Sequence, residues 1–354
     1  MRRTLSVVVA ATMLALAACG TQPAAPAQVT LAPDMSRAKI APPAPVIPEP
    51  EPEPEPPRWP LTGVRTDKVA DRPAVAVKIE NAAASRPHAG LHRADVVWEQ
   101  VVEGGISRFV AVYHSDLPKE VGPIRSVRPM DPATVAPLEG ILAASGGQGP
   151  FLDAVERTGT QLLTNDDGDR GFRRSGARAA PHNVYGDVRT FARQANKKRT
   201  EPPPAQFEYA DRRQDGTARR GKKAREVDVR LSPAQRTTWT WNAKAAEYRR
   251  SDGGRASMSS GRRVDAHNVL VLSMKVTNTG YRDPAGAPVP KTELVGQGKG
   301  VLLGGGRSVP VRWEKKGARA RLVLTRPNGA AVLLEPGNTW VELVPRGSGS
   351  WDVS

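Results

Sequence analysis

The stretch that decides the fold is DVVWEQVV at residues 95–102, followed by EGG at 103–105 and ISRFVAVY at 106–113. Both flanking runs are rich in β-branched and aromatic residues, which favour strands. The three residues between them include two glycines, a loop typical of a β-hairpin. The sequence therefore predicts a hairpin and, with it, a domain with a sheet core.

The sequence around this hairpin predicts both strands and helices. AVAVKIE at residues 74–80 and the apolar run at 141–144 are typical of strands. Residues 131–140, with Pro132 in the first turn, and residues 149–158 are typical of helices. We therefore expect residues 59–200 to form an N-terminal α/β domain with a mixed sheet, within a chain of the α+β class.

The second half of the chain has a different pattern. Residues 227–345 contain many short runs of alternating polarity separated by Gly and Asn turns. This pattern predicts a C-terminal domain made mainly of antiparallel strands, with residues 340–344 as its last strand. Residues 346–354 are predicted to be a frayed tail.

The two halves are separated by a basic, Pro-rich segment at residues 201–226. It contains PPP at 202–204, and residues 211–225 have almost no apolar side chains, which predicts a linker with a mobile basic loop. Residues 170–263 hold 24 Lys and Arg against 9 Asp and Glu, most of the formal net charge of +16. Such a charge favours a polyanionic partner, although a bias in genome composition would give the same excess.

The N-terminus predicts export and lipid attachment. Arg2 and Arg3 precede an apolar run that is too short to cross a bilayer and fits the apolar region of a signal peptide at residues 1–19. The run ends in LAAC at 16–19, which resembles a lipobox, so we expect lipidation of Cys19 and anchoring at the extracytoplasmic face of the cell membrane. Residues 20–58, rich in Pro and Glu, are predicted to be a disordered tether.

Cys19 is the only cysteine of the chain, which excludes intramolecular disulfides and zinc sites built from cysteines. No segment after the signal peptide has the 18 consecutive apolar residues that would predict a transmembrane helix. Sequence-specific nucleic-acid binding is not expected, because the chain is predicted to be exported and has no pattern of basic and aromatic residues typical of that function.

Several phrases resemble the YerB-like bacterial lipoproteins, whose two consecutive domains have no assigned function. These phrases are WPLTG at 59–63, IEN at 79–81, VEGGISRF at 102–109, GPIRSVRP at 122–129, APHNVY at 180–185 and GNTWV at 337–341. The resemblance covers roughly residues 59–345. It implies a lipoprotein with this two-domain layout and supplies no activity.

The first domain holds the densest cluster of polar residues, punctuated by Gly and Pro. Arginines on rigid turns suit the recognition of carboxylate or phosphate groups. The alternative is that the arginines and carboxylates pair with one another and fix the turns. The candidate ligand-binding residues are Asn81, Arg86, Arg108, Arg125, Arg128 and Asn183.

The candidate catalytic residues are Glu99, Glu103 and His182. Glycoside hydrolysis needs two carboxylates about 5 to 9.5 Å apart. Glu99 and Glu103 would lie about 13 Å apart on an extended strand, so this pair alone is disfavoured as an acid and base. His182 could act as a general base or as a hydrogen-bonded turn residue.

No metal or cofactor is expected. His88 and His92 are four residues apart, as two ligands on a helix would be, but no third ligand is apparent. Pro87 and Gly90 favour a loop at this position.

Three functions remain open from the sequence. The first is a binding or scaffold protein whose cleft of arginines and carboxylates takes an anionic wall polymer or a partner. The second is an envelope enzyme that acts on peptidoglycan or a related glycan. The third is an assembly factor that docks a protein through its β domain. Convergence of Glu99, Glu103, Arg108, Arg125 and His182 in one pocket would favour the enzyme.

Overall fold

The computed structural model describes residues 55–354. The predicted signal peptide at 1–19, the predicted lipidation of Cys19 and residues 20–54 of the predicted tether lie outside the described residues. The last residue of that tether belongs to the folded unit, because Arg58 forms an ion pair with Asp211 at 2.9 Å.

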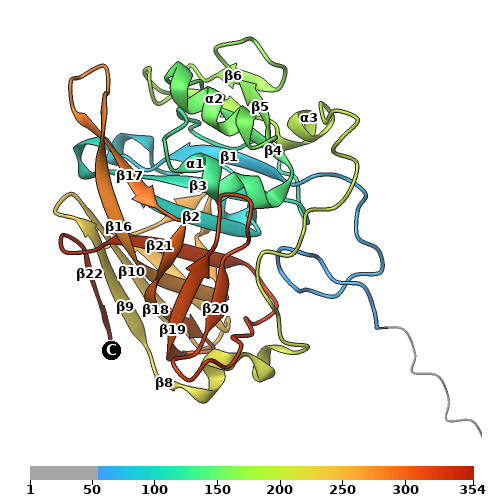
Figure 1. Ribbon diagram of the computed structural model, residues 1–354, viewed down its shortest axis with the longest axis vertical. Coiled ribbons are helices and arrows are strands. Elements are labelled where there is room, and N and C mark those ends of the chain that lie inside the picture. Colours follow the sequence, from blue (N-terminus) through green and yellow to red (C-terminus); the bar gives the residue numbers. More distant parts are fainter. Residues whose placement is uncertain (1–54) are drawn as a thin grey trace, which may run out of the picture. The chain divides into compact units, whose positions relative to one another are not determined.

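The first half of the described chain contains strands and short helices (Figure 1). Its strands are β1 (Val75–Glu80), β2 (Val96–Val101), β3 (Ser107–Tyr113), β4 (Ile141–Ala144), β5 (Gln161–Thr164), β6 (Phe172–Arg174) and β7 (Val184–Gly186). Its α-helices are α1 (Asp131–Val135), α2 (Gly149–Arg157) and α3 (Val188–Ala192). Its 3-10 helices are η2 (Ala83–Ser85), η3 (Leu91–Arg93), η4 (Glu103–Gly105) and η5 (Ala136–Leu138).

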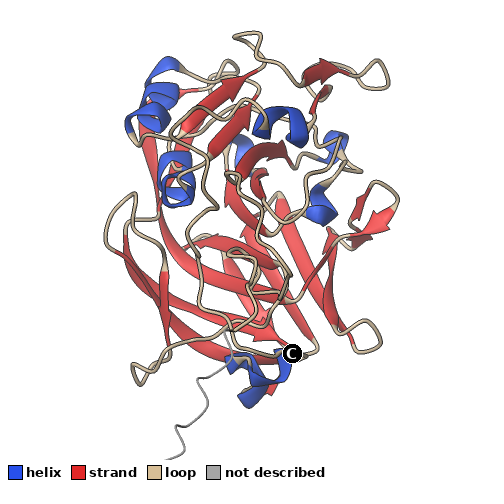
Figure 2. Cartoon of the chain, turned by 90° about the vertical axis from the view of Figure 1, so that its right-hand side faces the viewer, coloured by secondary structure: helices blue, strands red, loops and turns tan. Residues whose placement is uncertain are grey.

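The second half is built almost wholly from strands (Figure 1), and over the described residues the helices are few and short beside the strands (Figure 2). Two 3-10 helices, η6 (Arg213–Asp215) and η7 (Thr217–Arg220), precede the strands. The strands are β8 (Lys222–Lys223), β9 (Glu226–Ser232), β10 (Gln235–Asn242), β11 (Glu247–Asp252), β12 (Arg255–Ala256), β13 (Met258–Ser259), β14 (Arg262–Arg263), β15 (Asp265–Ala266), β16 (Asn268–Arg282), β17 (Pro288–Glu293), β18 (Gly296–Gly304), β19 (Arg307–Lys315), β20 (Val323–Thr325), β21 (Thr339–Pro345) and β22 (Ser350–Val353).

The predicted hairpin is confirmed and lies inside a large sheet. β2 and β3 are antiparallel, with Val97 opposite Ala111, and η4 forms the turn between them. The strand order is β20-β19-β18-β16-β21-β2-β3-β1-β4-β5, with β17 and β8 attached at the side. Parallel pairs such as β2 with β21 and β1 with β4 occur beside antiparallel pairs, so the sheet is mixed and the predicted α+β class is confirmed. Both halves of the chain contribute strands to this one sheet.

The central strands β1, β2 and β3 are buried along their whole length because both faces of the sheet are covered. In β1, Ala76 belongs to one hydrophobic core, whereas Val75 and Val77 belong to the other. Helices α1 and α2 cover the first face through Val135 and Phe151. The second face packs against a second sheet of order β12-β11-β10-β9-β22, with β15 beside β11.

Contacts between large aromatic rings join the two sheets. Trp239 of β10 packs edge-on against Trp340 of β21, with ring centroids 5.0 Å apart. Both side chains are fully buried. The described residues therefore form a sandwich with a hydrophobic core on each side of the large sheet.

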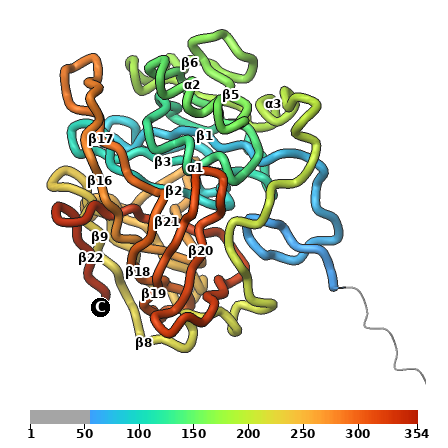
Figure 3. Tube along the Cα trace, in the orientation of Figure 1, coloured from blue at the N-terminus to red at the C-terminus, as the bar shows by residue number. Residues whose placement is uncertain are grey.

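Two predictions for the ends of the second domain are wrong. Residues 211–225 are not a mobile loop: they form η6, η7 and β8, because Ala218 and Ala224 are buried and Arg219 pairs with Glu335 at 2.7 Å. Residues 346–354 are not a frayed tail, because β22 pairs with β9. The end of the chain lies beside these two strands (Figure 3).

Within residues 55–354, none of the helices has the length and apolar character needed to cross a membrane.

Candidate functional site

A cleft of about 530 Å³ opens between two segments from different halves of the chain. One wall is the loop after β1, and the other is the turn between β11 and β13. Its lining residues are Ala83, Arg86, Pro87, His88, Asp252, Gly253, Arg255, Ala256, Ser257 and Met258. We call this cavity the cleft.

Hydrogen bonds to the end of β1 fasten the first wall. Arg86 donates from Nε to Oδ1 of Asn81 at 3.0 Å and from a terminal nitrogen to the Asn81 carbonyl at 2.9 Å. Nε2 of His88 donates to the Glu80 carbonyl at 2.8 Å. Because the last residues of a buried strand hold these side chains, the position of the loop is fixed by the sheet.

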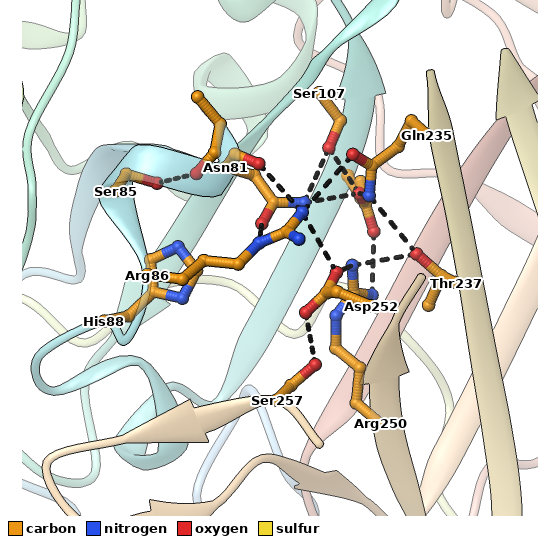
Figure 4. Close-up of polar contacts among 12 residues, drawn as sticks. Asn81, Ser85, Arg86, His88, Ser107, Gln235, Thr237, Arg250, Asp252 and Ser257 are labelled. Carbon is orange, nitrogen blue, oxygen red and sulfur yellow. Dashed lines mark hydrogen bonds and ion pairs between the residues drawn. The ribbon is translucent and has the colours of Figure 1, made fainter. Parts of the chain in front are cut away.

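The floor of the cleft is a chain of charged groups (Figure 4). Asp252 lies 3.4 Å from Arg86 and 2.8 Å from Arg250, and it also accepts a hydrogen bond from Ser257. Burial raises the pKa of Asp252, but the guanidinium groups of Arg250 and Arg86 outweigh this effect and lower it to about 2. Asp252 is therefore ionised at neutral pH.

Arg250 lies beneath Asp252 and is almost fully buried. Its guanidinium contacts Glu99 at 2.8 Å and Glu342 at 3.0 Å. Burial lowers the pKa of Arg250, but the three surrounding carboxylates raise it above its ordinary value. Its guanidinium carbon also lies 4.8–5.5 Å from the ring centroids of Phe109, Trp239 and Trp340, within the range of cation–π attraction.

Glu99 and Glu342 lie side by side because β2 and β21 are parallel neighbours in register. Burial and the Glu99 carboxylate raise the pKa of Glu342 well above its ordinary value. Glu99 accepts hydrogen bonds from Asn81 at 3.1 Å, Gln235 at 3.3 Å and Ser107. With a proton on Glu342, the two arginines and the two remaining carboxylates of this network balance in charge.

The structure brings three of the predicted site residues to the cleft or beneath it. Arg86 lines the cleft, Asn81 holds Arg86, and Glu99 lies below the floor. Glu99 is fully buried and does not line the cleft.

The other predicted residues lie away from the cleft and pair with neighbouring side chains. His182 and Arg125 contact Glu80 at 2.8 and 3.4 Å. Arg128 contacts Glu103 at 2.5 Å, whereas the nearest contact of Arg108 with Glu103 is 3.9 Å.

Burial and the neighbouring arginines lower the pKa of Arg108 to about 9. Asn183 accepts a hydrogen bond from Arg174 at 3.1 Å. The five residues whose convergence would favour an enzyme therefore do not share the cleft.

Sequence reasoning missed Arg250, Asp252, Ser257 and Glu342. The sequence signal for Arg250 and Asp252 is the period of two along β11, because Tyr248, Arg250 and Asp252 are buried on one side of this strand. Residues two apart on a strand share one face, so a charged residue two positions from a buried aromatic residue indicates a charge inside the sandwich.

The two histidines that resemble a metal pair have other partners. His88 binds the Glu80 carbonyl, and Nδ1 of His92 lies 3.1 Å from the Ser259 hydroxyl. Within residues 55–354, the structure contains no group of three or more His, Cys, Asp or Glu suited to hold a metal ion.

His88 predicts a pH dependence of stability. Burial lowers its pKa from 6.5 to about 4, so the unfolded chain binds a proton that the folded chain does not, and stability is lost as the pH falls from 6.5 towards 4. Each pKa unit corresponds to about 1.4 kcal/mol of unfolding free energy. His88→Gln has no titrating group at this position, so between pH 6.5 and 4 it should lose up to roughly 3 kcal/mol less stability than wild type. Urea unfolding at several pH values measures this difference. Burial also lowers the pKa of the less buried His92, so His92→Gln should flatten the pH profile less than His88→Gln does. Parallel pH profiles for wild type and His88→Gln would contradict the prediction.

Comparison with known proteins identifies relatives over most of the chain. Residues 61–201 match the family model "Protein of unknown function (DUF3048) N-terminal domain". Residues 227–341 match the model of the C-terminal domain of the same family. A Bacillus subtilis (strain 168) protein named "Putative lipoprotein YerB" is 27% identical over 300 residues, which cover 81% of this chain and 86% of the relative. The crystal structure of YerB from Bacillus subtilis matches with a TM-score of 0.71 and 25% identity, over 83% of this chain and 99% of that chain.

Proposed function

The chain belongs to the DUF3048 family of proteins of unknown function, and from this premise we propose that it is a lipid-anchored envelope protein that binds a carboxylate-bearing cell-wall ligand in the cleft. The ligand class that fits is an anionic wall component such as the stem peptide of peptidoglycan. The name of the Bacillus subtilis relative supports the lipid anchor, and the LAAC sequence at 16–19 supports lipidation of Cys19 on the extracytoplasmic face.

The observation that carries the proposal is the charge arrangement of the cleft. Arg86 is partly exposed there, with 27% of its side-chain surface accessible, and the exposed Arg255 lies in the opposite wall. Guanidinium groups bind carboxylates through two parallel hydrogen bonds. Asp252 on the floor offers an acceptor to an ammonium or amide group, which suits a peptide that carries both charges.

Binding is favoured over hydrolysis because the described residues give the cleft a single carboxylate. Among them, Asp252 is the only acidic residue that lines it, whereas Glu99 and Glu342 are fully buried below. A glycosidase needs two carboxylates that reach the same bond.

The test measures the affinity of residues 20–354 for a purified disaccharide tetrapeptide by calorimetry. Loss of a charge-assisted hydrogen bond costs about tenfold in affinity or more, so Arg255→Ala and Arg86→Ala are each expected to bind at least about tenfold more weakly. Arg255 makes the cleaner variant, because Arg86 also holds the loop through Asn81.

Lys119→Ala, which removes a charge outside the cleft, is the matched control and should bind as wild type does. Equal affinity of wild type and both arginine variants would refute the site. Release of cleaved fragments, detected by mass spectrometry, would instead establish an enzyme.

A further inference from the structure

A second cavity of about 610 Å³, which we call the groove, lies where β8, β18, β19 and β22 meet. Its apolar floor includes Val301, Val309 and Trp351. Three cationic residues, Arg220, Lys222 and Arg326, also line the groove. The groove shares no residue with the cleft, so it stands independently of the proposed function.

The charge of the groove is uncompensated. Its lining contains no Asp or Glu, and in the described part of the chain none of the three cations has an ion pair with a carboxylate. Nε of Arg326 is buried and has no hydrogen-bond partner among the described residues. A buried donor without a partner is costly, and an anion in the groove would supply one.

The basic segment noted in the sequence places two of these cations. η7 is fixed by the ion pair between Arg219 and Glu335, and the next residue, Arg220, is exposed. β8 pairs with the start of β19, which sets Lys222 opposite Ser308. The third side of the groove comes from β22, where Trp351 and Val353 alternate with Asp352.

We propose that the groove binds a segment of a phosphodiester-linked anionic polymer. A phosphodiester is fully ionised at neutral pH, and guanidinium groups bind its oxygens bidentately. The indole ring and the valines provide a surface for the apolar face of the sugar or polyol between two phosphates. The cleft does not suit such a ligand, because Asp252 would repel a chain of high charge density.

The concave shape favours a polymer segment over a membrane surface. A flat bilayer would meet the rim of the groove but leave the floor around Val301 and Val309 empty, whereas a single chain can lie along the floor. Membrane-binding surfaces instead present their basic and apolar side chains on a protruding face.

The test uses residues 20–354, which retain the whole described unit, with a synthetic glycerol-phosphate oligomer as the probe. Affinity is measured by calorimetry at several salt concentrations, from low to above physiological ionic strength. The triple variant Arg220→Ala, Lys222→Ala, Arg326→Ala is expected to bind at least about tenfold more weakly. The slope of log affinity against log salt concentration should be smaller in magnitude by about two. Each neutralised phosphate contributes roughly 0.7 to this slope, and the variant removes three cations.

The matched control removes the same charge elsewhere: Lys119→Ala, Lys197→Ala, Lys275→Ala, three exposed lysines outside the groove. It should keep wild-type affinity and slope, and a thermal melt shows whether each variant is folded. Equal loss in both triple variants would mean a general charge effect and would overturn the proposal. Binding to phosphatidylglycerol vesicles without binding to the oligomer would overturn it in favour of a membrane surface. Loss of binding in Arg255→Ala with retention in the groove variant would place the polymer in the cleft and would overturn it as well.

Discussion

Arg250→Met is expected to lower the free energy of unfolding by about 3–5 kcal/mol, because removal of one partner from a buried ionic network leaves the other charges without compensation. Arg250 is the cation that Glu99, Glu342 and Asp252 share inside the sandwich. Urea unfolding followed by tryptophan fluorescence measures the change.

The neighbouring Arg249→Met is the matched control for Arg250. Arg249 is more exposed and pairs with Glu247 at 3.2 Å, so its loss should cost less than about 1 kcal/mol. The stability cost of Arg250→Lys should lie between those of Arg250→Met and Arg249→Met, because lysine keeps the charge but lacks the planar guanidinium group that donates several hydrogen bonds at once. A cost below about 1 kcal/mol for Arg250→Met would show that the network does not stabilise the sandwich.

Asp131→Asn is expected to have an effect of similar size, about 3–5 kcal/mol, at the opposite face of the sheet. Lys78 and Asp131 form an ion pair of 2.6 Å in which both side chains are fully buried. Asp131, the first residue of helix α1, also accepts hydrogen bonds from Gln100 at 2.5 Å and from the Arg128 backbone at 2.7 Å. With a neutral asparagine in place of Asp131, the ammonium group of Lys78 would be buried without a counter-charge.

The same ion pair predicts a pH dependence with a defined sign. Burial lowers the pKa of Lys78 from 10.5 to about 8, although Asp131 opposes this effect. The unfolded chain therefore binds the proton more tightly, and stability increases as the pH rises from about 8 towards 10.5. In Asp131→Asn the pKa of Lys78 should fall further, so the pH range over which stability increases with pH should extend to lower pH.

A paired substitution provides the control for Asp131. Lys78→Met with Asp131→Leu removes both charges and should recover much of the stability that Asp131→Asn loses, as replaced buried pairs often do. Urea unfolding of the single and double variants from neutral to alkaline pH tests both expectations. A double variant no more stable than Asp131→Asn would show that packing of α1, rather than the buried charge, is what the substitution disrupts.

Local patterns predicted most of the first half of the fold. The hairpin around Glu103–Gly105, the short strand Ile141–Ala144 and the helix Gly149–Arg157 lie where the sequence places them. These elements depend on strand propensity, on turn residues and on a helix start with proline, all of which act over a few residues. The sequence therefore carried enough information to identify them.

The candidate site was predicted only in part, because its members come from distant segments. Arg86 and Asn81 were candidates, but their partners Asp252 and Gln235 lie in the second half of the chain, with Gln235 149 residues beyond Arg86. Glu103 and His182 were candidates beside Glu99, but neither side chain stands on a strand: Glu103 lies in η4 and His182 in the loop before β7. They pair with Arg128 and Glu80, away from the cleft. Hydrolysis by Glu99 and Glu103, a pair that their spacing along the strand already disfavoured, therefore gains no geometric support.

The sequence by itself determined the class of elements and the basic character of residues 170–263, and it carries the LAAC sequence that predicts lipid attachment, since each depends on composition or on neighbours along the chain. Only the tertiary structure decided that β2 and β21 are parallel neighbours and that Arg250 lies between their carboxylates. Only it decided that Arg220 and Lys222 line a groove with Trp351. The physical reason is that strand pairing joins residues from opposite ends of the chain, and the register of such pairs is set by burial across two sheets rather than by local preference.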